Sequence, residues 1–435
     1  MVKLKNPNHF RGIRMRVNVF FRNNPTIPYL VKWICISLGI SLAIGSASAG
    51  FLYSLQWVTD YRELHPYLIG FLPLAGLAIG LLYHYYGKDV EAGNNLIIDQ
   101  IHKPSQHIPL RMGIWVYLGT LVTHLFGGSA GREGTALQMA SSIAVQITAP
   151  LKLKAIDRKI LLIAAVAGGF GSVFGTPIAG AFFAMEFFRV GKINYLALFP
   201  AILTAVFADL IVKCWHVPHT HYHIDVIPSL SFLSIFYVIL AGICFGICAR
   251  FFSQGVFKLG QVFKANISYP PFRPLIGGIV VALIVFCMGT TKYIGLGIPT
   301  IVASFEQQLP AYDFLIKALL TILTIAAGFK GGEVTPLFFI GATLGNALGL
   351  IIPLPMGLLA GMGFVSVFAG ASNTPIACCL MAMELFGVEC GIFIGISCVV
   401  AYFMSGQHSI YRQQEIGQSK QQRNKQQEGK RLSEL

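Results

Sequence analysis

Two glycine-rich segments carry an acidic residue where an apolar stretch begins, and the first is residues 128–142, GSAGREGTALQMASS. If a helix begins there, its first N–H groups lack partners within the helix and form the positive end of the helix dipole, so they attract an anion. Glu133 can occupy these donors when it is ionised and release them when it is protonated. The pattern therefore predicts a residue that is both a gate and a proton carrier. A plain helix cap, or an ion pair with Arg132, is the alternative.

The second segment, residues 328–341, reads GFKGGEVTPLFFIG and supplies Glu333 and Thr335. The Thr335 hydroxyl can donate to an anion or accept from a proton carrier. We expect the N–H groups at Gly134 and Val334 to form the opposing walls of one anion site. Glu333 is either a proton relay or a polar cap that faces water.

Two further side chains are candidates for the same site. Asn94 follows Gly93 at another glycine-led helix start, where its amide can donate to an anion; a plain N-cap is the alternative. Tyr411 follows the last apolar stretch, a position typical of an aromatic anchor at the membrane interface.

A histidine-rich loop with the spacing H-x-x-H-x-H-x-H is a candidate metal site. This spacing matches no catalytic zinc or copper motif, so an interfacial loop is favoured over a metal site and over an intramembrane metalloenzyme. The histidines are His216, His219, His221 and His223. Because the sequence carries no P-loop, serine triad, HExxH or dinucleotide fingerprint, we expect neither an enzyme nor a cofactor.

The candidate segments belong to a duplicated chain. Residues 175–188 and 373–386 are identical at eight of fourteen positions, at an offset of 198. The GREGT and GGEVT motifs precede them in the same order at an offset of 200. Glu186 and Glu384 are equivalent in the two copies, so we expect a structural role for them, such as hydrogen bonds to another helix start.

The composition places these segments in a membrane. Hydrophobic residues make up 55% of the chain and charged residues 11%, and the mean hydropathy is +0.67. Because long apolar stretches alternate with short ones broken by Gly and Pro, we expect an all-α polytopic membrane protein with broken half-helices that meet at mid-membrane. The predicted units are a basic arm at 1–29, transmembrane repeats at 30–212 and 230–411, a His-rich connecting loop at 213–229 and a basic polar tail at 412–435.

The net charge of +14 is concentrated near the two ends of the chain, so it does not indicate nucleic-acid binding. Basic ends around a hydrophobic body follow the positive-inside rule, and both termini are therefore expected in the cytoplasm. Anionic membrane lipid would hold these ends near the bilayer. The polar composition of residues 412–435 predicts disorder.

The motifs GREGT, GTPIAGAFFAME and GGEVTP make the chain resemble the CLC family of anion channels and transporters over residues 30–411. The resemblance implies a fold of two inverted repeats, a homodimer with one pathway in each subunit, and a place in the bacterial inner membrane. Glu133 matches the gating glutamate of that family.

Three departures from chloride-handling members make the chain similar to the fluoride-exporting CLC-F branch. Asn94 takes the place of a coordinating serine, and Phe187 stands where exchangers carry a proton-relaying acid on the inner side. Glu333 and Thr335 replace an apolar turn, and on this resemblance they match residues that couple fluoride to protons. Tyr411 matches the tyrosine of the central site.

The predicted function is therefore fluoride/proton antiport, which drives fluoride out of the cytoplasm with the proton gradient. Fluoride is small and strongly hydrated, so a selective site must return the hydrogen bonds that water supplied. Asn94, Thr335 and Tyr411 offer such donors. A chloride/proton exchanger or a passive CLC-type anion channel is the alternative.

Overall fold

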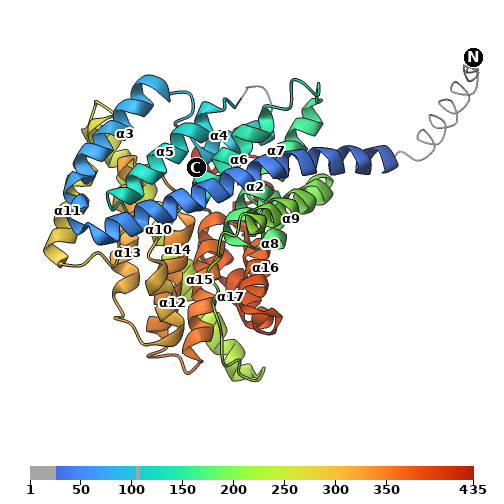
Figure 1. The fold of residues 1–435 in the computed structure, drawn as a ribbon. Helices are drawn as coiled ribbons and strands as arrows, with labels where there is room; N and C mark the ends of the chain where they lie inside the picture. Colours follow the sequence, from blue (N-terminus) through green and yellow to red (C-terminus); the bar gives the residue numbers. More distant parts are fainter. Residues whose placement is uncertain (1–25, 104–107) are drawn as a thin grey trace, which may run out of the picture.

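Two sets of α-helices follow each other along residues 26–103 and 108–435, the part of the chain that the computed structural model describes (Figure 1). The first set is α2 (Thr26–Leu64), α3 (Leu72–Tyr86), α4 (Asn94–His102), α5 (Arg111–Leu125), α6 (Glu133–Val145), α7 (Ala155–Phe174), α8 (Pro177–Glu186) and α9 (Leu198–Cys214). The second set is α10 (Phe232–Asn266), α11 (Phe272–Met288), α12 (Ile298–Glu306), α13 (Asp313–Ala327), α14 (Val334–Leu348), α15 (Met356–Ser372), α16 (Pro375–Phe386) and α17 (Gly391–Met404). Most of the predicted arm at 1–29 lies outside the described residues.

The two sets repeat element for element. The long helices α2 and α10 have 39 and 35 residues, and the short helices α4 and α12 have 9 residues each. Likewise α5 and α13 have 15 residues each. Elements of similar length in the same order are what a duplicated chain produces, so the predicted all-α membrane fold of two repeats is confirmed.

Short elements join the helices. The 3-10 helices are η1 (Pro66–Phe71), η2 (Tyr195–Ala197), η3 (Val388–Cys390), η4 (Gln422–Gln427) and η5 (Leu432–Glu434). The strands β1 (Arg189–Val190) and β2 (Glu415–Ile416) pair in parallel and join the segment between α8 and α9 to the C-terminal tail.

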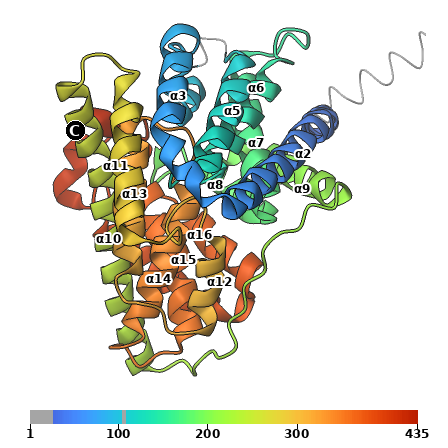
Figure 2. The same ribbon diagram turned by 60° about the vertical axis from the view of Figure 1, so that its left-hand side comes forward.

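Four of the described segments are long and apolar enough to cross a membrane: Thr26–Leu64, Pro66–Tyr86, Tyr195–Cys214 and Phe232–Asn266. Figure 2 shows α10, the last of these, running the height of the molecule, and it packs against α13. The nine-residue helices α4 and α12 extend only about 14 Å, less than half of a hydrocarbon core of about 30 Å. Neither helix can cross the bilayer alone.

Helices α7 and α15 form the centre of the molecule. Both are buried along most of their length, α7 against α6, α8 and α9, and α15 against α14, α10 and α17. Where α15 crosses α14, Gly363 and Gly341 face each other, and a Cβ atom on either would overlap the other's carbonyl oxygen.

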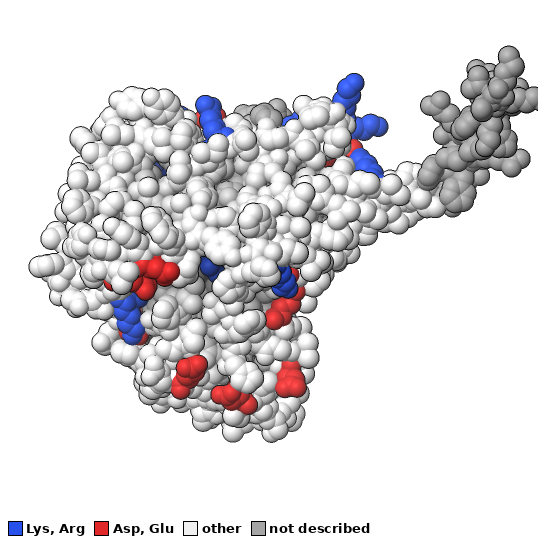
Figure 3. Space-filling view, viewed as in Figure 1, with Lys and Arg blue, Asp and Glu red and all other residues white. Residues whose placement is uncertain are grey.

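Most of the molecular face in Figure 3 is free of charged side chains. Lys and Arg project from the upper edge of this face, whereas among the described residues its lower end shows Asp and Glu only. Side chains of both signs also lie across the middle of this face, and the uncharged surface above them suits contact with lipid hydrocarbon, because charge is costly there.

The glutamates that the repeat makes equivalent each bind the helix start of the other half. Glu384 of α16 accepts hydrogen bonds from the N–H groups of Ile178 and Ala179 in α8, at 3.0 and 2.8 Å. Glu186 of α8 accepts from the corresponding N–H groups of α16 at 3.4 and 2.9 Å. The predicted structural role of both residues, as partners of another helix start, is confirmed.

Residues 412–435 are folded, so the predicted disorder of the tail is wrong. Leu432 is fully buried, and Lys420 donates at 2.7 Å to a carbonyl oxygen in the last turn of α17. Arg431 and Asp99 form an ion pair of 2.6 Å that joins the tail to α4. The polar residues of the tail hydrogen-bond to the ends of membrane helices, which leave carbonyl groups without partners.

Candidate functional site

The two predicted helix starts lie against each other. The segments that precede α6 and α14 run antiparallel: the Gly131 N–H donates to the Gly332 carbonyl at 2.5 Å, and the Gly332 N–H donates to the Gly131 carbonyl at 2.7 Å. A Cβ atom on Gly332 would lie 2.7 Å from the Gly134 nitrogen. The close approach of the two halves therefore requires glycine here.

Glu133, the first residue of α6, reaches across this bridge to the start of α14. Its Oε2 accepts from the Thr335 N–H at 3.1 Å, and its Oε1 accepts from the Thr335 hydroxyl. The Glu133 side chain is fully buried. A carboxylate thus occupies helix-terminal donors that also suit a free anion, and these donors belong to the other half of the chain.

Both alternative interpretations of Glu133 have a partial counterpart in the structure. Glu133 Oε1 lies 3.6 Å from Arg132 Nε, which is a weak ion pair, and Oε2 accepts from the Arg132 N–H at 3.1 Å. Arg132 is the N-cap residue of α6, so Glu133 also binds one N–H group at the start of its own helix. These contacts accompany its bonds to Thr335 and do not replace them.

A cavity of about 340 Å³ adjoins these helix starts on the side of the C-terminal tail, and we call it the tail-side cavity. The predicted site residues Asn94, Glu333 and Tyr411 all line it. Gln138 and Lys330 line it as well, and the sequence reasoning missed both. Their positions in the sequence could have indicated them, because Gln138 lies one turn beyond the GREGT motif on α6 and Lys330 directly precedes the GGEVT motif.

Asn94 begins α4, behind Gly93, whose φ of +56° favours glycine. The Asn94 side chain does not cap the helix, so the plain N-cap interpretation is wrong. Its Nδ2 lies 2.9 Å from the place that a Cβ atom on Gly134 would take, and its Oδ1 is buried without a partner among the described residues. The amide therefore lies against the start of α6.

Tyr411 is 2% exposed, so its interpretation as an interfacial anchor is wrong. Its ring packs edge-on against Phe187, with 4.8 Å between the ring centroids. Its hydroxyl is buried and has no hydrogen-bond partner among the described residues. A buried hydroxyl without a partner, in a residue that lines a cavity, is suited to donate to a bound anion.

A second cavity, of about 500 Å³, lies on the side of the loop between α9 and α10, and we call it the loop-side cavity. Arg132 and Thr220 line it. Arg132, the residue before Glu133, lines the loop-side cavity. Asn94, which lies against the residue after Glu133, lines the tail-side cavity. The buried Glu133 therefore lies between the two cavities.

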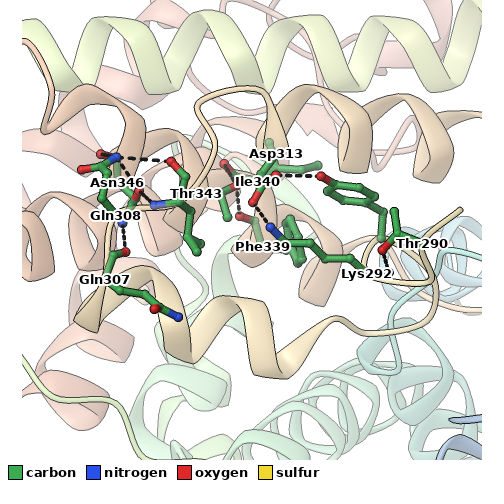
Figure 4. Close-up of polar contacts among 11 residues, drawn as sticks. Thr290, Lys292, Gln307, Gln308, Asp313, Phe339, Ile340, Thr343 and Asn346 are labelled. Carbon is green, nitrogen blue, oxygen red and sulfur yellow. Dashed lines mark hydrogen bonds and ion pairs between the residues drawn. The ribbon is translucent and has the colours of Figure 1, made fainter. Parts of the chain in front are cut away.

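The far end of α14 is fixed by a polar cluster (Figure 4). Asn346 donates to the carbonyl oxygens of Ser304 and Gln307 at 2.9 and 2.8 Å, and accepts from the Leu309 N–H at 2.9 Å. These bonds tie α14 to the end of α12. The helix whose start holds Glu133 is therefore anchored at both ends.

The family model described as voltage gated chloride channel matches residues 75–406, well over half of the chain. The chain belongs to the CLC family. A chloride/fluoride channel protein of Pseudomonas syringae pv. tomato is 49% identical over 403 residues, covering 91% of this chain and 89% of the relative. The ClcB protein of Escherichia coli, described as a voltage-gated ClC-type chloride channel, is 27% identical and is covered over 99% of its length.

Solved CLC structures share the fold. A CLC-type fluoride/proton antiporter superposes with a TM-score of 0.87 at 35% identity, covering 89% of this chain and 98% of the other. A slow cyanobacterial Cl⁻/H⁺ antiporter superposes with a TM-score of 0.72 at 18% identity. The resemblance to the CLC family, and to its fluoride-handling branch, is confirmed.

The histidine loop of this CLC protein gathers no metal-binding cluster. Among the described residues, no three His, Cys, Asp or Glu side chains lie close enough together to hold a metal ion. His219 faces Asp209 at 3.9 Å, and His223 faces Asp225 at 3.3 Å on an exposed stretch. The geometry of the loop therefore gives no support to the metalloenzyme alternative.

Proposed function

We propose that this CLC protein is a fluoride/proton antiporter that exports fluoride in exchange for protons, with Glu133 as its gate. The observation that carries the proposal is the Glu133 carboxylate on the N-terminal donors of α14, between the two cavities. Protonation removes the charge that these donors stabilise, and an anion from the tail-side cavity then takes its place.

The polar groups around the tail-side cavity support fluoride as the anion. Fluoride gives up strong hydration, so its site has to supply several hydrogen-bond donors at once. The Asn94 amide, the Tyr411 hydroxyl and the Thr335 N–H and hydroxyl are such donors. The names of the Pseudomonas relative and of the solved antiporter, both of which mention fluoride, agree with this assignment.

The proton path uses Glu333 together with Glu133. Phe187, which stands where exchangers carry an acid, is fully buried and packs on Tyr411, so it offers no proton-carrying group. Glu333 lines the tail-side cavity and follows Gly332, which is bonded to the segment before Glu133. A proton that leaves Glu133 toward the tail side therefore passes by way of Glu333 or across the Thr335 hydroxyl.

The remaining expectations from the sequence are part of the same proposal. The protein acts as a homodimer in the bacterial inner membrane, with one pathway in each subunit and both termini in the cytoplasm. The excess of Lys and Arg at the upper edge in Figure 3, with only Asp and Glu at the lower end, supports this orientation.

Liposomes that contain the purified protein test the proposal directly. With fluoride inside and a proton gradient directed inward, we expect fluoride efflux that is matched by proton uptake. The same liposomes loaded with chloride should show little flux. Proton-coupled chloride flux of equal size would instead identify a chloride/proton exchanger, and fluoride flux without proton movement would identify a passive channel.

A further inference from the structure

A third cavity, of about 770 Å³, adjoins the tail-side cavity and lies between the end of α10, the end of α17 and the C-terminal tail. One face of α10 supplies Arg250, Gln254 and Lys258, which are spaced four residues apart and so point the same way. Arg412 lines it from the opposite side, with its guanidinium 3.9 Å from the centre of the Phe257 ring. We call this space the basic cavity.

The side chains that line the basic cavity carry a net positive charge. No Asp or Glu side chain lines it, and among the described residues Arg250, Lys258 and Arg412 form no ion pair. Burial lowers the pKa of His408, at the cavity wall, and four surrounding cations lower it further: Arg250, Arg412, Lys420 and Lys258. Three permanent charges that face one cavity favour an anionic occupant.

Two other features narrow the class of that occupant. Gln407 Oε1 and Gln427 Oε1 are buried in lining residues and have no partner among the described residues, so they can accept from ligand hydroxyls. Phe257, Phe403 and Met404 line the same cavity and are 37%, 47% and 39% exposed. A ligand that satisfies all three features carries an anionic group, hydroxyls and an apolar part.

We propose that the basic cavity binds the headgroup of an anionic phospholipid, with the phosphodiester against Arg250, Lys258 and Arg412. The headgroup hydroxyls bind Gln407 and Gln427, and the acyl chains run over Phe403 and Met404. Arg412 also lines the tail-side cavity, so the bound lipid lies at the mouth of the anion path. This site does not depend on which ion the protein transports.

Native mass spectrometry of the purified full-length chain, titrated with phosphatidylglycerol or phosphatidylcholine, tests the proposal. We expect phosphatidylglycerol to be retained in preference to phosphatidylcholine. The double variant Arg250→Gln/Lys258→Gln should bind phosphatidylglycerol about tenfold or more weakly, because each cation near a membrane surface contributes measurably to anionic lipid binding.

Two matched variants separate this effect from misfolding and from total charge. Lys152→Gln/Lys154→Gln removes two charges from exposed positions between α6 and α7 and should bind phosphatidylglycerol as the wild type does. The swap Arg250→Lys/Lys258→Arg keeps the charge and should retain binding. Equal loss in the Lys152/Lys154 variant, or undiminished binding in the Arg250→Gln/Lys258→Gln variant, would overturn the proposal.

Two further measurements distinguish a lipid from other anions. If inorganic phosphate competes for the site at the concentrations at which phosphatidylglycerol binds, the ligand is a soluble phosphate and the lipid assignment is wrong. In liposomes of phosphatidylcholine alone, the Arg250→Gln/Lys258→Gln variant should transport as the wild type does. A slower flux there would mean that the cations gather the transported anion, which would also overturn the proposal.

Discussion

Two pairs of glutamates are related by the duplication, and the structure treats them differently. Glu186 and Glu384 are reciprocal: each accepts from the first-turn N–H groups of the other half's helix. Glu133 and Glu333 are not. Glu133 is buried on the start of α14, whereas Glu333 stays in its own half and lines the tail-side cavity.

The neighbouring threonines show the same loss of symmetry. The Thr335 hydroxyl donates to Glu133, whereas its counterpart Thr135 bonds to Thr120 within its own half at 2.6 Å. The contacts of Glu186 and Glu384 stabilise both halves equally, so nothing requires them to differ between the halves. A pathway with one gate requires unequal halves, so the broken symmetry supports the proposal that Glu133 and Thr335 act on the ion.

Among substitutions that test this comparison, Glu133→Gln should have the largest effect on coupled transport. An amide cannot carry the proton, so proton uptake should fall by about 100-fold or more. Fluoride flux should then stop or become independent of pH, depending on whether the amide stays on the α14 donors. Simultaneous recording of fluoride and proton flux in liposomes measures both. Proton-coupled fluoride transport that persists in this variant would remove Glu133 as the gate.

The pair Thr335→Val and Thr135→Val tests the asymmetry between the threonines. Thr335→Val removes the hydroxyl that holds Glu133, and we expect coupled flux to fall about tenfold, the effect of losing one hydrogen bond to a charged group. Thr135→Val, which is buried to the same degree, should leave coupling intact. If the two variants lose coupling equally, the halves contribute equally and the comparison fails.

Replacement of Asn94 by Ser should have a smaller effect, confined to selectivity. The serine side chain is shorter than that of asparagine, and a serine hydroxyl is the donor that the resemblance implies for chloride-handling relatives. We expect the preference for fluoride over chloride to fall by up to about tenfold, the range for one hydrogen bond. Fluxes of the two halides measured in parallel give the ratio, and an unchanged ratio would exclude Asn94 from selectivity.

The smallest effect on transport should come from Glu384→Gln. The neutral amide keeps one acceptor for the start of α8 but loses the charge that both N–H groups stabilise, so the free energy of unfolding should fall by about 1–2 kcal/mol. Thermal unfolding in detergent measures this loss. Coupled fluoride transport should survive below the unfolding temperature, in contrast to Glu133→Gln, and a loss of proton coupling would contradict a purely structural role.

Much of the fold could be predicted because it depends on local patterns. Glycines before Glu133 and before Glu333 mark helix starts, and the repeat predicts that the two starts occupy equivalent places. The partners of Glu186 and Glu384 follow from the same symmetry. These features depend on spacing along the chain, which the sequence records directly.

Contacts across the duplication were harder to predict. The sequence places a carboxylate and two helix starts together, but only the antiparallel bridge shows that Glu133 binds the donors of α14. Tyr411 appeared to lie at the interface because it follows the last apolar stretch, yet the folded tail buries it. Polar composition predicts disorder for a tail in water, and not for one whose side chains satisfy helix ends.

The paired backbone at Gly131 and Gly332 restricts how the barrier between the cavities can move. Displacing either segment would break both hydrogen bonds between Gly131 and Gly332. The two backbones also pack so closely that neither position has room for a side chain. On the proposed mechanism the moving part is the Glu133 side chain, whose rotation belongs to a faster class of motion than the closure of loops or domains. A transport cycle of this kind leaves the outline of the protein in the bilayer almost constant, so lateral pressure from the surrounding lipid does little work against it.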